Sequence, residues 1–257
     1  MIPAIDSKIR RRFDASAGRY DRYTTLHRQI AERLLSRVTK MPAPKICLDV
    51  GCGTGYLTRR LKDCFPQSEI TGLDFAQGML EAARVQNPGI AWILADSRRL
   101  PFSDGHFDAL VSNLAYQWAA DLPQAFGEAR RVLASGGILA CTLFGFQTCR
   151  ELFESLDQAK AGQLQFARLP DTNQVREALT LGGFREPGVD REEIKITFKG
   201  MHELMLWLKA VGANNLLQEG YLGPEALLRA AAIYKEKFSN QQGVESTFEV
   251  IWVHAQK

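Results

Sequence analysis

The stretch LDVGCGTGYL, at residues 48–57, constrains the fold of this chain more than any other part of it. A short apolar run ends at Asp49, and glycines follow at the alternate positions Gly51, Gly53 and Gly55. Because glycine has no Cβ atom, such a loop can turn tightly and bring a ligand close to the backbone N–H groups that open the next helix. A strand, a glycine loop and a helix in this order are typical of an α/β fold that binds a nucleotide-like ligand.

The sequence around this loop alternates short apolar runs with helical patterns. Strands buried on both faces read as continuous apolar runs, and their alternation with helices indicates βαβ units in a parallel sheet. We expect strands at 46–50, 69–73, 90–94, 107–111 and 137–144, and helices at 55–64, 77–86 and 121–133.

Polar and apolar residues alternate in two later segments, 192–198 and 244–250. Period-two alternation is typical of strands with one partly wet face, such as antiparallel strands at a sheet edge. The sequence therefore predicts an α/β fold with a Rossmann-like, doubly wound sheet that is mostly parallel and has an antiparallel last strand.

Helical stripes flank this predicted core. Ahead of it, an amphipathic helix is expected over residues 21–39, with the apolar positions Leu26, Ile30, Leu34, Leu35 and Val38. Two more stripes lie between the fifth strand and residue 243: Leu204, Leu208 and Val211, then Leu227, Ala231 and Tyr234. We expect this helical insertion to form walls or a lid at the carboxyl edge of the sheet, where open α/β folds bind ligands.

Composition limits the class of protein. The chain has 257 residues, of which 46% are hydrophobic, enough for one large α/β domain. Its formal net charge of +3 is too small to imply nucleic-acid binding by itself. The five cysteines show no CxxC pair or metal-ligand spacing, which predicts reduced thiols and no metal site. With no signal-peptide pattern and no apolar run of ~18 residues, we expect a cytoplasmic protein that does not span a membrane.

Acidic residues end the first two predicted strands, Asp49 before the glycine loop and Asp74 in TGLDF. A carboxylate at the first position repels a pyrophosphate but attracts an ammonium or sulfonium group. At the second position it can accept hydrogen bonds from both hydroxyls of a ribose, as a similarly placed acid does in dehydrogenases. The third glycine is displaced by one residue from the dinucleotide pattern G-x-G-x-x-G, so a tight turn without a ligand stays an alternative.

The segment ILADSRRLPFSDGHFDALVSN, residues 93–113, places Asp96 directly after the third strand and before a Leu-Pro-Phe turn and the fourth strand. Over about residues 45–145 this order resembles the S-adenosylmethionine-dependent methyltransferases of the Rossmann-like class. The resemblance implies that S-adenosylmethionine is the cofactor and S-adenosylhomocysteine its product. The residues that it assigns to the cofactor are Tyr20, Asp49, Gly51, Cys52, Gly53, Gly55, Asp74, Phe75, Met79, Asp96, Ser97 and Asn113.

The resemblance also implies a role for most of these residues. Asp49 and the glycines would line the methionine and ribose end, and Asp74 would hold the ribose hydroxyls. The adenine would be bordered by Phe75 and Met79, with Asp96 and Ser97 at its amino group, and Asn113 would lie near the transferred methyl group. Tyr20 would turn its hydroxyl toward the methionine carboxylate, or simply pack the N-terminal helix.

Three segments are similar to the malonyl-[acyl-carrier protein] O-methyltransferases of biotin synthesis: residues 11–35 ahead of the core, SNLAYQWAADL at 112–122 after the fourth strand, and LKAVGANN at 208–215 far downstream. That family methylates the free carboxylate of malonyl-[acyl-carrier protein], and the methyl ester primes pimeloyl formation. The resemblance implies a single methyltransferase domain over 1–257: a helical extension (1–44), the cofactor-binding core (45–145), acceptor-side helices with an edge strand (146–243) and the final strand (244–257).

The chemistry expected of such an enzyme needs no general base. A carboxylate, with a pKa near ~4, is already the nucleophile at neutral pH, so rate enhancement should come from positioning and partial desolvation. We therefore predict no catalytic base among the scattered histidines. For the acceptor we predict Gln117, Trp118, Arg168 and Lys209, where the two cations would bind the malonyl carboxylate. Solvated charges, and a core position for Trp118, stay alternatives.

Basic residues gather near the N-terminus: Lys8, Arg10, Arg11, Arg12, Arg19, Arg22 and Arg28. They would attract an acidic acyl-carrier protein that bears a malonyl-phosphopantetheine arm, or form an ordinary solvated face. We expect no nucleic-acid partner, because aromatic residues do not interleave with the run IRRRF. We expect a monomer or weak oligomer.

Two other functions stay open. A small free carboxylic acid could be the acceptor, because trans-aconitate methyltransferases also have an N…QW segment after the fourth strand. A non-catalytic methyltransferase-like binding protein is the third hypothesis, although the glycine loop and its acids are intact.

Overall fold

The structure, a computed structural model, describes residues 4–160, 165–166, 169–213, 217–219 and 222–257. Two compact units make up the chain. Unit 1 is Met1–Leu143, Thr172–Asp190 and Ile251–Lys257, and unit 2 is Phe144–Asp171 and Arg191–Val250. Each is described by itself, and the single domain over 1–257 stays a prediction.

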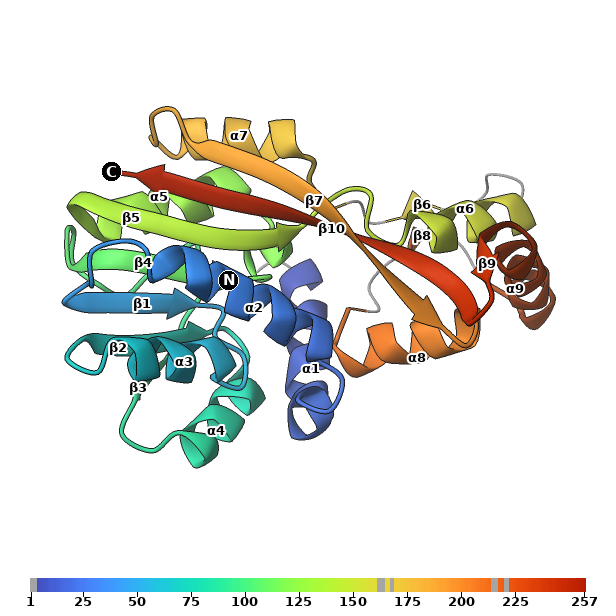
Figure 1. The fold of residues 1–257 in the computed structure, drawn as a ribbon, viewed down its shortest axis with the longest axis horizontal. Helices are drawn as coiled ribbons and strands as arrows, with labels where there is room; N and C mark the ends of the chain where they lie inside the picture. The colour runs from blue at the N-terminus through green and yellow to red at the C-terminus, as the bar shows by residue number, and fades with distance from the viewer. Residues whose placement is uncertain (1–3, 161–164, 167–168, 214–216, 220–221) are drawn as a thin grey trace. The chain divides into compact units, whose positions relative to one another are not determined.

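The main sheet has its strands in the order β3-β2-β1-β4-β5-β10-β7 (Figure 1). Their bounds are β1 Ile46–Val50, β2 Glu69–Asp74, β3 Ala91–Leu94, β4 Phe107–Asn113, β5 Leu133–Phe144, β7 Gly188–Phe198 and β10 Gly243–Gln256. The first five strands pair in parallel. Near the start of β5 the Gly136 N–H donates to the carbonyl of Lys257, and just after its end the Gly145 N–H donates to that of Glu249. β10 is therefore antiparallel to β5, which confirms the predicted antiparallel last strand.

Helices cover both faces of the sheet in unit 1. The side chains of Leu48 and Leu110 belong to the apolar cluster that contains α5 (Leu122–Val132) and α7 (Thr172–Leu181). The alternate residue of β1, Asp49, faces the other side, where it accepts a hydrogen bond from Thr58 of α3 (Tyr56–Cys64). That side also carries α2 (Thr25–Val38), which packs on α3. The doubly wound fold is confirmed.

The N-terminal helix α1 (Ala4–Tyr20) was not predicted, and the helix expected over 21–39 begins only at Thr25. The basic run at 10–12 interrupts the apolar positions of α1 and masks their helical spacing. The helix packs on α4 (Gln77–Gln86), where the side chain of Asp14 accepts a hydrogen bond from the Gly78 N–H at 2.8 Å. A Cβ at Gly78 would lie 3.0 Å from the carbonyl oxygen of Asp14, so glycine permits this close contact.

Unit 2 contains the helices of the predicted insertion. They are α6 (Arg150–Ala159), α8 (Met201–Ala210) and α9 (Pro224–Phe238), with the short strands β6 (Gln165–Phe166), β8 (Leu217–Glu219) and β9 (Ser239–Asn240). In α9 the predicted Tyr234 is buried, whereas the other two buried positions are Ala226 and Ala230, each one residue before the predicted Leu227 and Ala231. The Tyr234 hydroxyl donates to the carbonyl of Glu245, which sets the rotation of the helix. That these helices act as a lid stays a prediction.

The start of β5 also differs from the prediction. β5 begins at Leu133, four residues before the expected start at 137, because the chain leaves α5 directly into the sheet. None of the helices in the described ranges is long and apolar enough to cross a membrane.

The close contact between Gly51 of the glycine loop and Ala115 can be tested by substitution. In Gly51→Ala the new Cβ would lie 2.1 Å from the Cβ of Ala115, and φ is +71°. In the control Gly89→Ala, φ is +94° and no atom lies within 4 Å. We expect the control to lose about 1 kcal/mol of unfolding free energy from the left-handed backbone alone, and Gly51→Ala to lose about 2–4 kcal/mol because a clash is added. Urea denaturation checks this, and equal losses would contradict the close contact with Ala115.

Candidate functional site

A cavity lies at the carboxyl ends of β1, β2 and β4 in unit 1, with about 880 Å³ of space that includes its opening to solvent. The structure brings ten of the predicted site residues to its wall: Tyr20, Gly51, Gly53, Asp74, Phe75, Met79, Asp96, Ser97, Asn113 and Trp118. A second cavity of about 450 Å³ shares four of these residues with the first and adds Asp49, Cys52 and Arg28. Parallel strands end at one edge of the sheet, which explains why residues so far apart in sequence meet here.

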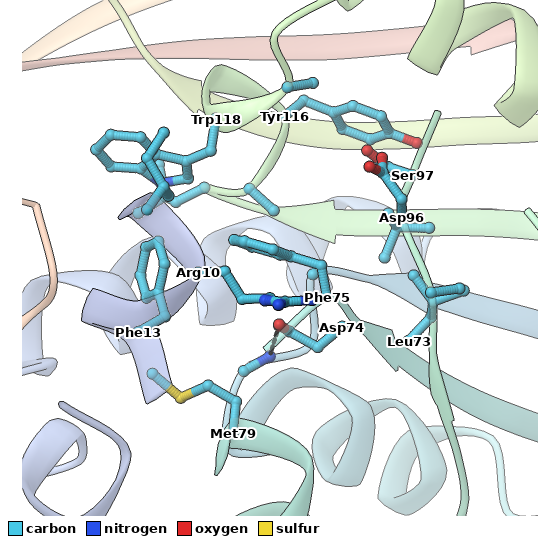
Figure 2. A pocket seen from close by; sticks show the side chains of 18 of the residues that line it. Arg10, Phe13, Leu73, Asp74, Phe75, Met79, Asp96, Ser97, Tyr116 and Trp118 are labelled. Atoms are coloured by element: carbon cyan, nitrogen blue, oxygen red, sulfur yellow. Dashed lines mark hydrogen bonds between the residues drawn. The ribbon is translucent and has the colours of Figure 1, made fainter. Parts of the chain in front are cut away.

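The glycine loop is fixed to the end of β2. The N–H groups of Gly51 and Cys52 donate to the carbonyl of Leu73 at 2.7 and 2.9 Å. The Gly53 N–H donates to the carboxylate of Asp74 at 2.8 Å (Figure 2). Asp74 also accepts from the Ala76 N–H at 2.8 Å. Despite these bonds, burial raises the pKa of Asp74 to about 6.

Asp49 lies under the same loop and is buried. One of its carboxylate oxygens accepts a hydrogen bond from the Thr58 hydroxyl at 2.6 Å. The other, Oδ1, is buried and has no hydrogen-bond partner among the described residues. Burial raises the pKa of Asp49 to about 7, and the nearby charge of Asp74 adds to the rise. Such a carboxylate is suited to a positively charged group of a ligand.

Asp96 is held by its neighbour Arg98. The guanidinium forms an ion pair with the carboxylate, with 2.6 Å between Nη2 and Oδ2, and the Arg98 N–H donates to Oδ1 at 2.9 Å. Burial acts to raise the pKa of Asp96, but the hydrogen bonds from Arg98 outweigh it and the pKa is lowered. Asp96 is therefore an ionised acceptor at the wall of the larger cavity.

Three aromatic rings stand together at this wall. Phe13 of α1 lies between Phe75 and Trp118, with ring centroids 5.9 and 5.8 Å away, in edge-to-face geometry (Figure 2). Ile9 and Arg10 of α1 also line the cavity. A helix that precedes the sheet thus supplies part of the wall.

Asn113 joins the end of β4 to α2. Its side-chain amide donates to the carbonyl of His27 at 3.1 Å, and its side-chain oxygen accepts from the Thr142 hydroxyl at 2.9 Å. Tyr20 packs edge-on against the His27 ring at 6.0 Å. Burial raises the pKa of the Tyr20 hydroxyl and lowers that of His27 to about 4, so both rings are neutral near pH 7.

The sequence of the chain is similar to that of known methyltransferases. A family model described as a methyltransferase domain matches residues 48–141. The malonyl-[acyl-carrier protein] O-methyltransferase of Halorhodospira halophila is 37% identical over 255 residues, which are 96% of this chain and 86% of that protein. The proteins of the same name from Xylella fastidiosa and Geobacter sulfurreducens are 36% and 35% identical, covering 96% and 95% of this chain and 86% and 96% of theirs. The chain belongs to the malonyl-[acyl-carrier protein] O-methyltransferase family.

Solved methyltransferases share the fold of this family member. An S-adenosylmethionine-dependent methyltransferase of Thermotoga maritima matches with a TM-score of 0.58 at 20% identity, over 96% of this chain and 99% of that one. A phosphoethanolamine N-methyltransferase of Haemonchus contortus, in complex with S-adenosylmethionine, matches with a TM-score of 0.55 at 19% identity, over 88% of this chain and 52% of that one. At these identities the likeness concerns the fold.

The two cavities fit the cofactor that the sequence analysis predicts for a methyltransferase. The buried Oδ1 of Asp49 is the acceptor that an ammonium group would satisfy. Gly51 and Gly53 line both cavities, so the backbone of the glycine loop is open to a ligand there. The methyltransferase domain and the family support S-adenosylmethionine as the cofactor.

Some predicted residues lie elsewhere. Gly55 directly precedes α3 with φ +86°, and a Cβ there would lie 2.5 Å from the Trp92 ring, so it makes room for that indole. The Gln117 side chain donates to the carbonyl of Leu114 at 2.8 Å, and Gln117 is not among the wall residues of either cavity. Lys209 is an exposed residue of α8 in unit 2. Arg168 lies outside the described residues.

Other wall residues were missed or given a different role. Ile9 and Arg98 had no predicted part in the site, Arg10 and Arg28 appeared only in a basic face, and Phe13 only in a family segment. The spacing of Ile9, Phe13 and Tyr20 is the signal that would have found α1, because residues at i, i+4 and i+11 share one side of a helix.

The two buried carboxyl groups predict a pH-dependent affinity for S-adenosylhomocysteine. Their pKa values, about 7 for Asp49 and about 6 for Asp74, lie above the usual value, so both groups become protonated as the pH falls from 7.5 to 5.5. The neutral form cannot attract an ammonium group, so affinity should fall by about tenfold per pH unit below the higher pKa.

Isothermal titration calorimetry between those pH values checks this. Asp49→Asn removes one of the two titrating groups, so its profile should be flatter than that of the wild type. The exposed Asp190 gives the control Asp190→Asn, which should keep the wild-type slope. A flat wild-type profile would contradict the role of the two carboxylates.

Proposed function

We propose that the protein transfers a methyl group from S-adenosylmethionine to the free carboxylate of malonyl-[acyl-carrier protein], giving the methyl ester that primes pimeloyl formation in biotin biosynthesis. The observation that carries the proposal is the extent of the similarity. The relatives of that name match 95–96% of the chain, whereas the methyltransferase domain alone spans residues 48–141. The match therefore includes α1, α2 and unit 2, the parts that a methyltransferase core leaves to acceptor recognition.

One group of wall residues would hold the methionine and ribose parts of the cofactor, and a second group would hold its adenine. The ionised Asp49 would face the ammonium group of its methionine part, and Asp74 would accept hydrogen bonds from the ribose hydroxyls. The aromatic ring of Phe75 and the side chain of Met79 would border the adenine, with Asp96 at its amino group. The sulfonium centre of the bound cofactor supplies an electrophilic methyl group.

The wall residues would position the malonyl carboxylate against the methyl group. The malonyl carboxylate is ionised at neutral pH and needs no proton removed. With its pKa lowered to about 4 by burial, His27 would be a weak base, and the proposal assigns it no proton transfer. Phe13 and Trp118 cover the cavity with apolar surface, which excludes water from the reacting carboxylate and lowers its solvation. Gln117, Arg168 and Lys209 stay predictions for acceptor binding.

Arg28 is suited to the methionine carboxylate. It lines the smaller cavity with Asp49, and its guanidinium lies 5.1 Å from the centre of the Tyr56 ring. Its Nε–H is buried without a hydrogen-bond partner in the described part of the chain, while Nη2 lies 3.4 Å from the carboxylate of Asp21. An arginine with an unused donor next to this cavity can bind a carboxylate in a bidentate manner.

Arg28→Gln should therefore weaken S-adenosylhomocysteine binding by about tenfold, because a charge-assisted hydrogen bond is lost. The matched control is Arg37→Gln on the same helix, where the guanidinium stacks 4.1 Å from the centre of the Trp252 ring. Calorimetry at pH 7.5 gives both affinities. An unchanged affinity in Arg28→Gln would remove Arg28 from the cofactor site.

We propose that the protein works in the cytoplasm as a monomer or weak oligomer, without a nucleic-acid partner. All five cysteines are free thiols, which agrees with a reducing compartment.

Intact-protein mass spectrometry tests the reaction. Malonyl-[acyl-carrier protein] incubated with the enzyme and S-adenosylmethionine should gain the mass of one methylene group, and acetyl-carrier and unloaded carrier should gain nothing. The free carboxylate is the only difference that separates the first from the second. If the malonyl carrier is unchanged while the cofactor binds, the proposal fails, and methylation of a small carboxylic acid such as trans-aconitate would then identify the acceptor class.

A further inference from the structure

The solvent side of α1 and of the turn after it carries a basic face, which we define as Lys8, Arg11, Arg19 and Arg22. All four residues are exposed. Over the ranges that the structure describes, none of the four has a hydrogen-bonded or ion-paired side-chain partner. Positive charge is therefore concentrated on one surface of unit 1, although the whole chain has a net charge of only +3.

Several cations elsewhere on the surface are neutralised by a neighbour. Arg60 pairs with Glu32, Arg131 with Glu128, Arg150 with Glu193, Lys195 with Glu245 and Lys237 with Glu154, at 2.7–3.1 Å. The basic face has no such carboxylates among the described residues. It differs from other unpaired cations of unit 1, such as Lys40, Arg59 and Arg185, because its four charges gather on one helix and the turn after it. Its members even repel one another, since Lys8 and Arg11 are three residues apart, as are Arg19 and Arg22. Arg19 stands in the last turn of α1, where a cation is favourable, but the other three charges make no contact among the described residues that would stabilise the fold.

The opposite side of the same helix lines the candidate active site. Ile9, Phe13 and Tyr20 contribute to the wall of the larger cavity. A helix with its side chains is about 10–12 Å across, so a partner on the basic face would lie about one helix diameter from that cavity. The hydrogen bond from the Gly78 N–H to Asp14 fixes α1 against α4 and keeps this geometry.

We infer that the basic face is the docking surface for an acidic helix of the carrier protein that delivers the malonyl group. The inference rests on the proposed function, and it adds where the partner binds. Complementary charges would raise the rate of encounter and orient the carrier, so that its arm passes the edge of α1 into the cavity. Because the charges are exposed, this attraction would be screened by salt.

The test compares two triple charge reversals. The docking variant is Arg11→Glu, Arg19→Glu and Arg22→Glu. The control variant is Lys40→Glu, Arg59→Glu and Arg185→Glu, which changes the net charge equally at exposed positions of unit 1 outside the basic face. Fluorescence anisotropy measures binding of labelled malonyl-carrier at about 0.05 and 0.3 M salt. Methylation of malonyl-pantetheine, which has no carrier to dock, reports the chemical step.

We expect the docking variant to bind the carrier at least about tenfold more weakly at low salt, with a smaller salt dependence than the wild type. Its kcat/KM with malonyl-pantetheine, and its affinity for S-adenosylhomocysteine, should stay at the wild-type level. The control variant should bind the carrier as the wild type does. Normal carrier binding by the docking variant, or equal weakening in both variants, would overturn the inference. Binding of RNA but not of the carrier to the wild type would overturn it too.

Failure of the proposed function gives a different pattern. In that case the wild type would methylate neither malonyl-carrier nor malonyl-pantetheine, while S-adenosylhomocysteine still binds. Loss of the docking surface alone would instead leave malonyl-pantetheine methylation intact. The two results are therefore distinguishable in the same set of measurements.

Discussion

The hydrogen bonds that tie the glycine loop to the end of β2 determine the shape of the whole site. Leu73 accepts two of them through its carbonyl, and Asp74 accepts the third through its side chain. They hold the ends of two neighbouring strands together and turn the loop toward α3. Every other wall residue is positioned relative to this junction, because β4 pairs with β1 and α1 packs on the helix that follows β2. Loss of the junction would release the glycine loop from the end of β2, while the pairing of β1 with β2 and β4 would still keep the strand ends at one edge.

Burying two acids at this junction lowers the stability of the folded protein, whereas it would raise the affinity for a positively charged ligand. Asp49 and Asp74 are poorly solvated, and their raised pKa values show that the folded protein disfavours their ionised forms. A group with a raised pKa contributes less to stability as the pH rises from its unfolded value through its folded value. Both acids therefore weaken the unliganded protein near pH 7. A positively charged, hydroxyl-bearing ligand removes that penalty, so stability is exchanged for affinity at this site.

Much of the core could be predicted because its signals are local. The apolar runs and the glycine loop gave five parallel strands, and the period-two segments gave the antiparallel edge. From the loop pattern alone, a glycine that packs against the neighbouring backbone cannot be distinguished from one that makes room for a distant side chain. Gly51 narrows the loop beside Ala115, whereas Gly55 and Gly72 leave room for the Trp92 ring from the next strand. That distinction depends on a contact between distant residues, which no local pattern contains.

The parts that escaped prediction depend on tertiary contacts in the same way. The helix α1 has few apolar residues and is stabilised by its packing on α4. Arg98 is next to Asp96 in sequence, but its use as the partner that fixes this acid follows from a turn geometry. The cation for the acceptor could not be selected from sequence, because many arginines and lysines have equal local context.

The position of α1 has a consequence for how such enzymes diverge. One wall of the larger cavity comes from α1, which precedes residue 48, where the methyltransferase domain match begins. The glycine loop, the two acids and the sheet can therefore stay unchanged while this one helix is replaced. Recombination or design at the N-terminus alone would exchange both a side of the binding chamber and an outer recognition surface in a single step. Under the proposed function, such a replacement would alter part of the acceptor surface and leave the residues around the methyl donor unchanged.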